Sequence, residues 1–297
     1  MTTSYTGETR QQTAVSLSSS KSKSTKVKLS QMRQVLIIGG RIVFLALLIL
    51  LWQVVANKLD NPLFLSSPLS VWERLREWAT DGTTWYSSTL ASNTGVTLEE
   101  TLLGLFYGVI GGIVAGVFFG VQPILAEIFN PFIIGLYSIP KVALAPLFIL
   151  WFGFGLEMKV ILAAVTVFFL VFLNTLAGMR SVDQDLINAV FLMGGKRRDV
   201  ILKVMIPSAT GYILTGLRIA IPYALIGAVV AEMVSINTGL GYLINNSAAD
   251  FDTAGVFSAL LVLGVIAGVL NAIVNFIDRK TSRWKAGMRI TSRIIPQ

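Results

Sequence analysis

Six apolar stretches, each long enough to cross a lipid bilayer, constrain this chain more than any other feature. A helix rises 1.5 Å per residue, so about 20 apolar residues span a hydrocarbon core of about 30 Å. The stretches lie at about 35–57, 101–122, 128–152, 160–178, 209–235 and 254–277. The third is interrupted by Pro131, Pro140, Lys141 and Pro146, which predicts a broken helix. The chain is therefore predicted to be an all-α polytopic membrane protein with six transmembrane helices.

The composition excludes several classes of function. The net charge is +8, but the basic residues gather in the tails and one loop, which argues against nucleic acid as a partner. The chain has neither His nor Cys, so it lacks the usual general base and the common zinc, haem and iron–sulfur ligands. It also lacks a G-x-x-x-x-G-K-[ST] motif. We predict no metal site, no nucleotide hydrolysis on this chain and no enzymatic activity.

The distribution of Lys and Arg predicts the orientation. The N-terminal tail, the 179–207 loop and the C-terminal tail hold 17 of these residues, whereas the opposite side holds only Lys58, Arg74, Arg76 and Lys159. By the positive-inside rule both ends are cytoplasmic. We predict a disordered basic tail over 1–33, a transmembrane domain over 34–280 and a second basic tail over 281–297. The polar region 58–100 is predicted to lie outside, with an interfacial helix at about 68–79.

The loop 181–207 is too long and too regular for a plain turn between spans. Ser181 and Gln184 have the form of a capping box, and an apolar stripe follows at helical spacing, formed by Leu186, Ala189, Val190 and Met193. Gly194 and Gly195 are predicted to end this helix, with a positive φ at Gly194. A second short amphipathic run is predicted to stop at Pro207. Periodicity alone leaves two readings open, a docking surface for a soluble partner and a helix lying on lipid headgroups.

Glycine recurs at every fourth position of the second span. Gly104, Gly108, Gly112, Gly116 and Gly120 would form one face of a helix. Such a stripe lets another helix approach the backbone closely. We interpret it as a packing surface in a tight helical bundle.

Some charged residues fall within the apolar stretches. A charge at the centre of a membrane span costs about 2.5–3.5 kcal/mol on insertion scales. Besides Arg41 near the start of the first stretch, Lys141, Arg218 and Glu232 stand out and need a reason to be there. Arg218 can extend its head group toward the cytoplasmic surface. Lys141 and Glu232 are candidates for a translocation path, with Asn174 as a weaker one, and the alternative for each is a structural polar contact.

Several ordered motifs resemble those of bacterial ABC importer permeases. The family's loop signature reads E-A-A, three residues, G, and later I-x-L-P. Here the corresponding residues are Asn188-Ala189-Val190, Gly194 and Val204-Met205-Ile206-Pro207. The segments 139–155, 216–218, 226–232 and 238–244 are similar to the binding-protein-dependent subfamily that handles nitrate, sulfonates, taurine and vitamin precursors. The resemblance covers about 35–280.

The resemblance implies a fold, a mechanism and a set of partners. It implies the type I importer permease fold with a cytoplasmic coupling helix. Two ATP-binding subunits, a second permease chain forming a homodimer and an extracytoplasmic solute-binding protein would complete the assembly in the bacterial cytoplasmic membrane. ATP would be used by the partner, with no cofactor on this chain. The residues expected to bind the ATPase are Leu186, Asn188, Ala189, Val190, Met193, Gly194, Gly195 and Pro207.

The chain departs from the family signature at two positions. Asn188 replaces the usual Glu, and Val190 replaces the second Ala, so a contact made by that carboxylate is not expected here. The alternative function is a self-sufficient secondary carrier or channel. It would predict inverted repeats, which the two halves do not show, and it would leave the loop unused.

Overall fold

The structure, a computed structural model, describes residues 36–58, 65–235 and 238–281. The chain divides into two units, Met1–Pro68 and Leu69–Gln297, which are described separately. In the first unit the helix Leu36–Lys58 has 23 residues and a mean hydropathy of 2.2, enough to cross a membrane. It coincides with the predicted span at 35–57. Both tails predicted at the chain ends lie outside the described residues, apart from position 281.

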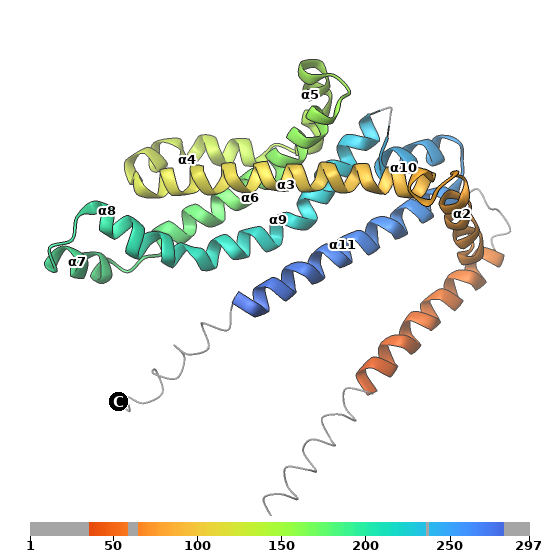
Figure 1. The fold of residues 1–297 in the computed structure, drawn as a ribbon, viewed down its shortest axis with the longest axis horizontal. Helices are drawn as coiled ribbons and strands as arrows, with labels where there is room; N and C mark the ends of the chain where they lie inside the picture. The colour runs from red at the N-terminus through yellow and green to blue at the C-terminus, as the bar shows by residue number, and fades with distance from the viewer. Residues whose placement is uncertain (1–35, 59–64, 236–237, 282–297) are drawn as a thin grey trace, which may run out of the picture. The chain divides into compact units, whose positions relative to one another are not determined.

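The described part of the second unit consists of helices joined by short connections (Figure 1). In chain order its elements are α2 (Pro68–Thr80), η1 (Trp85–Ser87), α3 (Thr89–Val121), α4 (Pro123–Ser138), η2 (Lys141–Leu144), α5 (Ala145–Phe152), α6 (Leu156–Arg180), α7 (Gln184–Leu192), α8 (Arg197–Val200), η3 (Ile201–Met205), α9 (Ile206–Val234), α10 (Leu240–Ala249) and α11 (Thr253–Thr281). The helix predicted near 68–79 is α2. The helix α3 begins twelve residues before the predicted span at 101–122, because the polar stretch from Thr89 to Glu100 is helical as well.

The glycine stripe of α3 packs directly on α6. Gly104, Gly108, Gly112, Gly116 and Gly120 are all buried. A Cβ added at Gly108 would lie 2.6 Å from the Ala164 carbonyl oxygen, and one added at Gly116 would lie 2.5 Å from the Thr175 Cβ. Real Cβ atoms do not approach other atoms this closely. The prediction of close helix packing at this stripe is therefore confirmed.

The span predicted at 128–152 is broken, as its prolines indicated. The helices Pro123–Ser138 and Lys141–Phe152 meet at an angle of 85°. Ile139 and Pro140 separate them in extended conformation, and Pro146 lies in the first turn of α5, where its missing N–H costs nothing. With this pair counted as one span, the described residues contain six candidate spans, and without it five. The predicted all-α fold with six membrane spans is confirmed.

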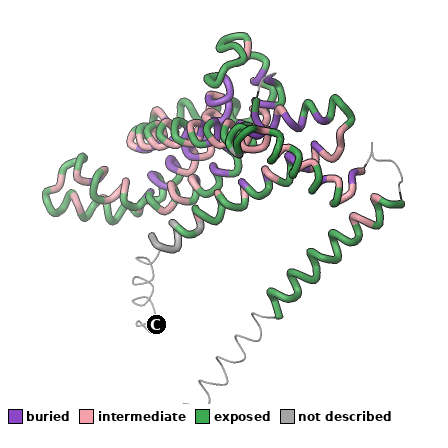
Figure 2. Tube along the Cα trace, turned by 45° about the vertical axis from the view of Figure 1, so that its right-hand side comes forward, coloured by how far each residue is buried: buried purple, intermediate pink, exposed green. Residues whose placement is uncertain are grey.

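The second unit has two distinct ends (Figure 1). The helices α3, α6 and α9 run side by side along it, and the shared contacts of α6 with both neighbours place α6 in the middle. The helices α7 and α8 lie at one end, whereas α2 and α10 lie at the opposite end. Figure 2 shows exposed and intermediate residues at the α7 end, with most buried residues farther along the bundle.

Candidate functional site

The helix α7 is the apolar amphipathic helix predicted in the loop, but it begins differently. Its N-cap is Asp183, whose side chain accepts a hydrogen bond from the Asp185 N–H at 3.0 Å. The Ser181 hydroxyl donates instead to the Gly178 carbonyl at 2.9 Å. The predicted capping box of Ser181 and Gln184 is therefore wrong. Ser181 lies at the C-cap of α6, where its side chain is satisfied by the preceding helix.

A glycine turn ends α7. Gly194 has a φ of +81°, so the predicted positive φ is confirmed. The Gly195 N–H donates to the Val190 carbonyl at 2.9 Å, and a Cβ at Gly195 would lie 2.5 Å from Val190 Cγ1. Both glycines are thus required for this turn, one by its backbone conformation and the other by the closeness of the preceding helix.

The turn presents apolar side chains outward. Met193 is 87% exposed, and Leu192, which the predicted stripe did not include, is 88% exposed. Three other predicted residues are also exposed, namely Leu186, Asn188 and Ala189. Val190 is half-buried and lies close to Gly195. Asn188 accepts a hydrogen bond from the Gln184 side chain at 3.3 Å, one turn earlier. The pair Leu192–Met193 is therefore the most prominent apolar feature of this end.

The helix does not end at Pro207, so the prediction from the sequence is wrong at this point. Residues Arg197–Val234 form one continuous helix of 38 residues. Proline lacks an N–H and its ring clashes with the carbonyl four residues earlier. A π-helical turn over Ile201–Met205 precedes Pro207, and Pro207 is the second residue of α9, in a first turn where proline is tolerated. The loop is further attached to the bundle by Arg197, which donates to the Val121 carbonyl at 3.0 Å.

Lys141 caps the helix α4. Its Nζ donates to the carbonyls of Leu136, Tyr137 and Ile139 at 3.1, 2.7 and 2.7 Å, and it lies 4.9 Å from the centre of the Phe169 ring. A cation at a helix C-terminus satisfies carbonyls that have no partner within the helix. Lys141 therefore makes structural polar contacts, the alternative to a role in the translocation path that the sequence left open.

Glu232 lies in a buried polar cluster at the opposite end. It is fully buried, and its carboxylate accepts hydrogen bonds from the Thr97 hydroxyl at 2.6 Å and the Gly241 N–H at 2.7 Å. Beside it, Lys159 and Glu100 form an ion pair at 2.8 Å. Lys159 is 3% exposed, so it is buried within the bundle. Both Lys159 and Glu100 were missed as cluster members; each stands at the edge of an apolar stretch, which is the one sequence signal they carry.

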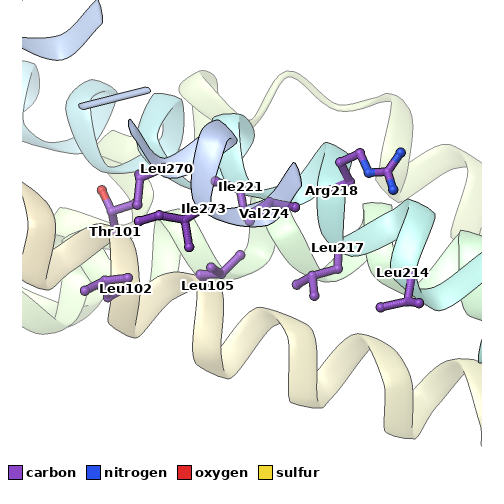
Figure 3. A pocket seen from close by; sticks show the side chains of 10 residues that line it. All are labelled: Thr101, Leu102, Leu105, Leu214, Leu217, Arg218, Ile221, Leu270, Ile273 and Val274. Carbon is purple, nitrogen blue, oxygen red and sulfur yellow. The ribbon is translucent and has the colours of Figure 1, made fainter. Parts of the chain in front are cut away.

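The remaining candidates lie between helices. Asn174 donates to the Leu170 carbonyl at 2.8 Å, and its Cβ packs on Gly216 where α6 crosses α9. Arg218 is twelve residues into α9, or about 18 Å along it at 1.5 Å per residue, so it does not lie at the end of this helix. It borders an apolar cavity of about 220 Å³ between α3, α9 and α11, and its guanidinium group points away from Leu217 (Figure 3).

The chain has no His and no Cys, so Asp and Glu are its remaining common metal ligands. Among the described residues, no group of three or more of them could hold a metal ion. The arrangement therefore has two notable parts, an exposed apolar turn at one end and a buried charged cluster at the other. The geometry is that of a membrane helix bundle with a protruding apolar turn.

Comparison with known proteins identifies the family. Residues 108–284 match the model of the binding-protein-dependent transport system inner membrane component. The chain is 34% identical to the taurine transport system permease protein TauC of Escherichia coli, over 81% of this chain and 87% of that protein. It is also 34% identical to the riboflavin transport system permease protein RibX of Chloroflexus aurantiacus, over 83% of this chain and 90% of that protein.

A solved structure has the same fold. A chain of the MetNI methionine ABC transporter, in an inward-facing conformation, superposes with a TM-score of 0.58 at 18% identity, over 65% of this chain and 95% of that chain. The self-sufficient carrier is not favoured by these relatives. The chain belongs to the binding-protein-dependent transport system inner membrane components, and it is a membrane-spanning permease subunit of an ATP-driven importer.

Proposed function

We propose that residues 181–207 form the coupling loop through which this permease binds its ATPase. The observation that carries the proposal is the exposure of Leu192 and Met193, at 88% and 87%, on a turn whose backbone is fixed by Gly194. Two adjacent large apolar side chains held outward on a rigid turn suit a partner's pocket, because buried apolar anchors dominate binding energies at protein interfaces. Leu186, Ala189 and Val190 would extend the same contact, while Asn188 would border it.

The basic surroundings of the turn support a cytoplasmic position. Lys196, Arg197 and Arg198 follow Gly195 directly, and Arg197 fixes this segment to the end of α3. Basic loops stay on the cytoplasmic side of the membrane. We therefore place the coupling loop and both chain ends in the cytoplasm, with the protein in the bacterial cytoplasmic membrane.

The complete importer would contain four core chains and a delivery protein. Two ATP-binding subunits would each bind one coupling loop, and a second copy of this chain would complete the path across the membrane. An extracytoplasmic solute-binding protein would supply the solute. ATP would be bound and hydrolysed by the ATPase subunits, with no cofactor and no catalysis on this chain, in keeping with the absence of a P-loop motif from its sequence.

The solute is proposed to be a small anion or a vitamin-like molecule. One relative named for taurine and one named for riboflavin are equally identical to this chain, at 34%. Uptake of both solutes should be measured in cells that express this chain with the ATPase and binding protein encoded beside it. Uptake of neither, when the same cells take up a different class of solute such as a sugar, would overturn this assignment.

The coupling loop is tested by Met193→Asp. A carboxylate in an apolar pocket should weaken ATPase association at least tenfold, since that needs only about 1.4 kcal/mol. The readout is co-purification of the ATPase with the tagged permease. Gly194→Val should act similarly, because a β-branched residue is strongly disfavoured at positive φ.

The matched control is Gln184→Asp. It adds the same charge to the same helix, but at the first turn, where a negative charge is favourable and the side chain is exposed. We expect normal co-purification and normal membrane insertion for this variant. Retention of ATP-dependent transport at the parent rate by both Met193→Asp and Gly194→Val would show that the loop is not the coupling site.

A further inference from the structure

The turn before α10 is held by the buried cluster through its backbone. Gly239 has a φ of +113°, and its N–H donates to the Asn93 side chain at 2.7 Å. The three other contacts of this turn are Leu240 N–H to Thr97 at 2.9 Å, Gly241 N–H to Glu232 at 2.7 Å and Lys159 to the Thr238 carbonyl at 2.9 Å. The partners come from α3, α6 and α9, so one short turn joins three long helices to α10.

The charges in this cluster do not balance. Glu100 is 1% exposed, Lys159 is 3% exposed and Glu232 is fully buried, which gives two carboxyl groups for one ammonium group. The segment 238–249 adds no charged residue. The acidic neighbours Glu99 and Glu157 are exposed. With both carboxyl groups ionised the cluster would carry an uncompensated buried negative charge, which is strongly unfavourable.

One oxygen atom of the cluster has no donor. Glu100 Oε1 accepts from Lys159, and both oxygens of Glu232 accept hydrogen bonds, from Thr97 and Gly241. Glu100 Oε2 is buried and has no hydrogen-bond partner among the described residues. The Glu100 and Glu232 side chains interact with each other. A proton on Glu100 Oε2 would turn this atom into a donor to Glu232.

We propose that the cluster holds one proton, carried by Glu100 Oε2 and shared with Glu232, and that in this neutral form it locks the Thr238–Gly241 turn to α3, α6 and α9. The assignment accounts for both irregularities at once. It supplies the missing hydrogen bond at Glu100, and it leaves one carboxylate to balance the Lys159 ammonium. Two adjacent carboxyl groups that share a proton are the usual arrangement where both cannot ionise.

The proton is tested by Glu100→Gln. A glutamine amide keeps a carbonyl for Lys159 and places an N–H where the protonated carboxyl has its O–H, so it reproduces the proposed state without a titratable group. In the full chain, purified in lipid nanodiscs, its melting temperature should stay within about 3 °C of the parent. Lys159→Met should lower it by about 10 °C, because a buried carboxylate then loses its counter-ion.

Infrared spectroscopy gives a direct readout of the proton. The parent should show the C=O stretch of a protonated carboxylic acid, shifted by exchange into heavy water, and this band should disappear in Glu100→Gln. Glu99→Gln is the matched control, because it makes the same change one residue away at an exposed side chain. It should keep both the band and the melting temperature.

Two results would overturn the proposal. The first is a Glu100→Gln protein that unfolds as readily as Lys159→Met, since Glu100 would then be needed as a carboxylate. The second is a parent spectrum in which no protonated-carboxyl band depends on Glu100. The second measurement stays decisive even where Lys159→Met fails to fold.

Discussion

The two ends of the helix bundle are built in opposite ways. At the α7 end, apolar side chains face outward, with Leu192 and Met193 nearly fully exposed. At the α10 end, charged side chains face inward, with Glu232, Glu100 and Lys159 almost inaccessible to solvent. One end leaves apolar groups uncovered, whereas the other buries charged groups and pairs them within the chain.

This difference separates association from folding. Substitution of Leu192 or Met193 at the α7 end removes a side chain that is almost fully exposed, so it should change binding to a partner and leave stability intact. Substitutions at the α10 end remove groups that hold three helices together, so they should change stability first. Each of the following predictions tests one side of this separation.

The largest expected effect is all-or-none labelling of the two ends. The chain lacks cysteine, so a single introduced thiol reports its own side of the membrane. Ser247 is buried against Gly255 and would label poorly, whereas Ala249 on α10 and Lys196 beside α7 are exposed. With an impermeant thiol reagent on intact cells, Ala249→Cys should label and Lys196→Cys should label only after permeabilisation. The reverse pattern would place the basic loop outside.

Glu232→Gln should destabilise the fold by about 3 kcal/mol or more. A glutamine amide nitrogen that faces the Gly241 N–H opposes two donors, and one that faces the Thr97 hydroxyl forces that hydroxyl to accept instead of donate. Either orientation therefore loses one charge-assisted hydrogen bond. Thermal unfolding in lipid nanodiscs measures the loss. The molecules that do fold should bind the ATPase normally, and a stable variant with impaired ATPase binding would contradict the separation of the two ends.

Leu192→Asp should weaken ATPase association about as much as Met193→Asp, and more than Leu186→Asp. Leu192 is 88% exposed and Leu186 is 54% exposed, since the latter already contacts its own chain. A side chain that is buried more deeply in the partner's pocket loses more binding free energy when it is replaced by a charged one, typically about 2 kcal/mol or more. Titration of the purified ATPase against each variant gives the order, and equal effects at Leu186 and Leu192 would shift the contact toward the beginning of α7.

Lys141→Met should cost about 1–2 kcal/mol of stability, because three carbonyls at the end of α4 lose their donor. We expect solute uptake per folded molecule to remain, and Lys141→Arg to restore stability. A loss of uptake at unchanged stability would place Lys141 in the translocation path. The same comparison applies to Asn174→Ala, which removes an amide that donates to the Leu170 carbonyl within α6.

Asp81→Asn should have the smallest effect, below about 1 kcal/mol. The hydroxyl and backbone N–H of Thr89 hold the pKa of Asp81 below its ordinary value. Because the pKa is lower in the folded protein, this contribution is complete above the ordinary pKa and is lost as the pH falls through the lowered one. The stability difference between parent and variant should therefore vanish on acidification, and a difference that grows at low pH would exclude this contact.

Features carried by neighbouring residues could be predicted from the sequence. The glycine stripe of α3, the break near Pro140 and the turn at Gly194 each depend on residue types at fixed local spacing, and all three occur in the structure. The position of Met193 on the apolar stripe also follows from the helical period, but the exposure of Leu192 and Met193 comes only from the structure.

Features that join distant parts of the chain could not be predicted. Lys159 and Glu100 are 59 residues apart, and Thr97 and Glu232 are 135 residues apart. Each alone reads as a polar residue at a helix end, and only the packing of α3, α6 and α9 brings them together. The π-helical turn before Pro207 could not be predicted either, because a proline in the sequence by itself indicates the end of a helix.

The helix Arg197–Val234 connects the two ends, and its length sets a limit on movement. Its 38 residues extend about 57 Å, so a tilt of about 5° about the Arg197 end displaces the other end by about 5 Å. The Glu232 hydrogen bonds of 2.6 and 2.7 Å near that far end would not survive such a displacement. Any tilt of this size must therefore carry the Thr238–Gly241 turn and α10 along with it, or else be absorbed by the π-helical turn close to the pivot.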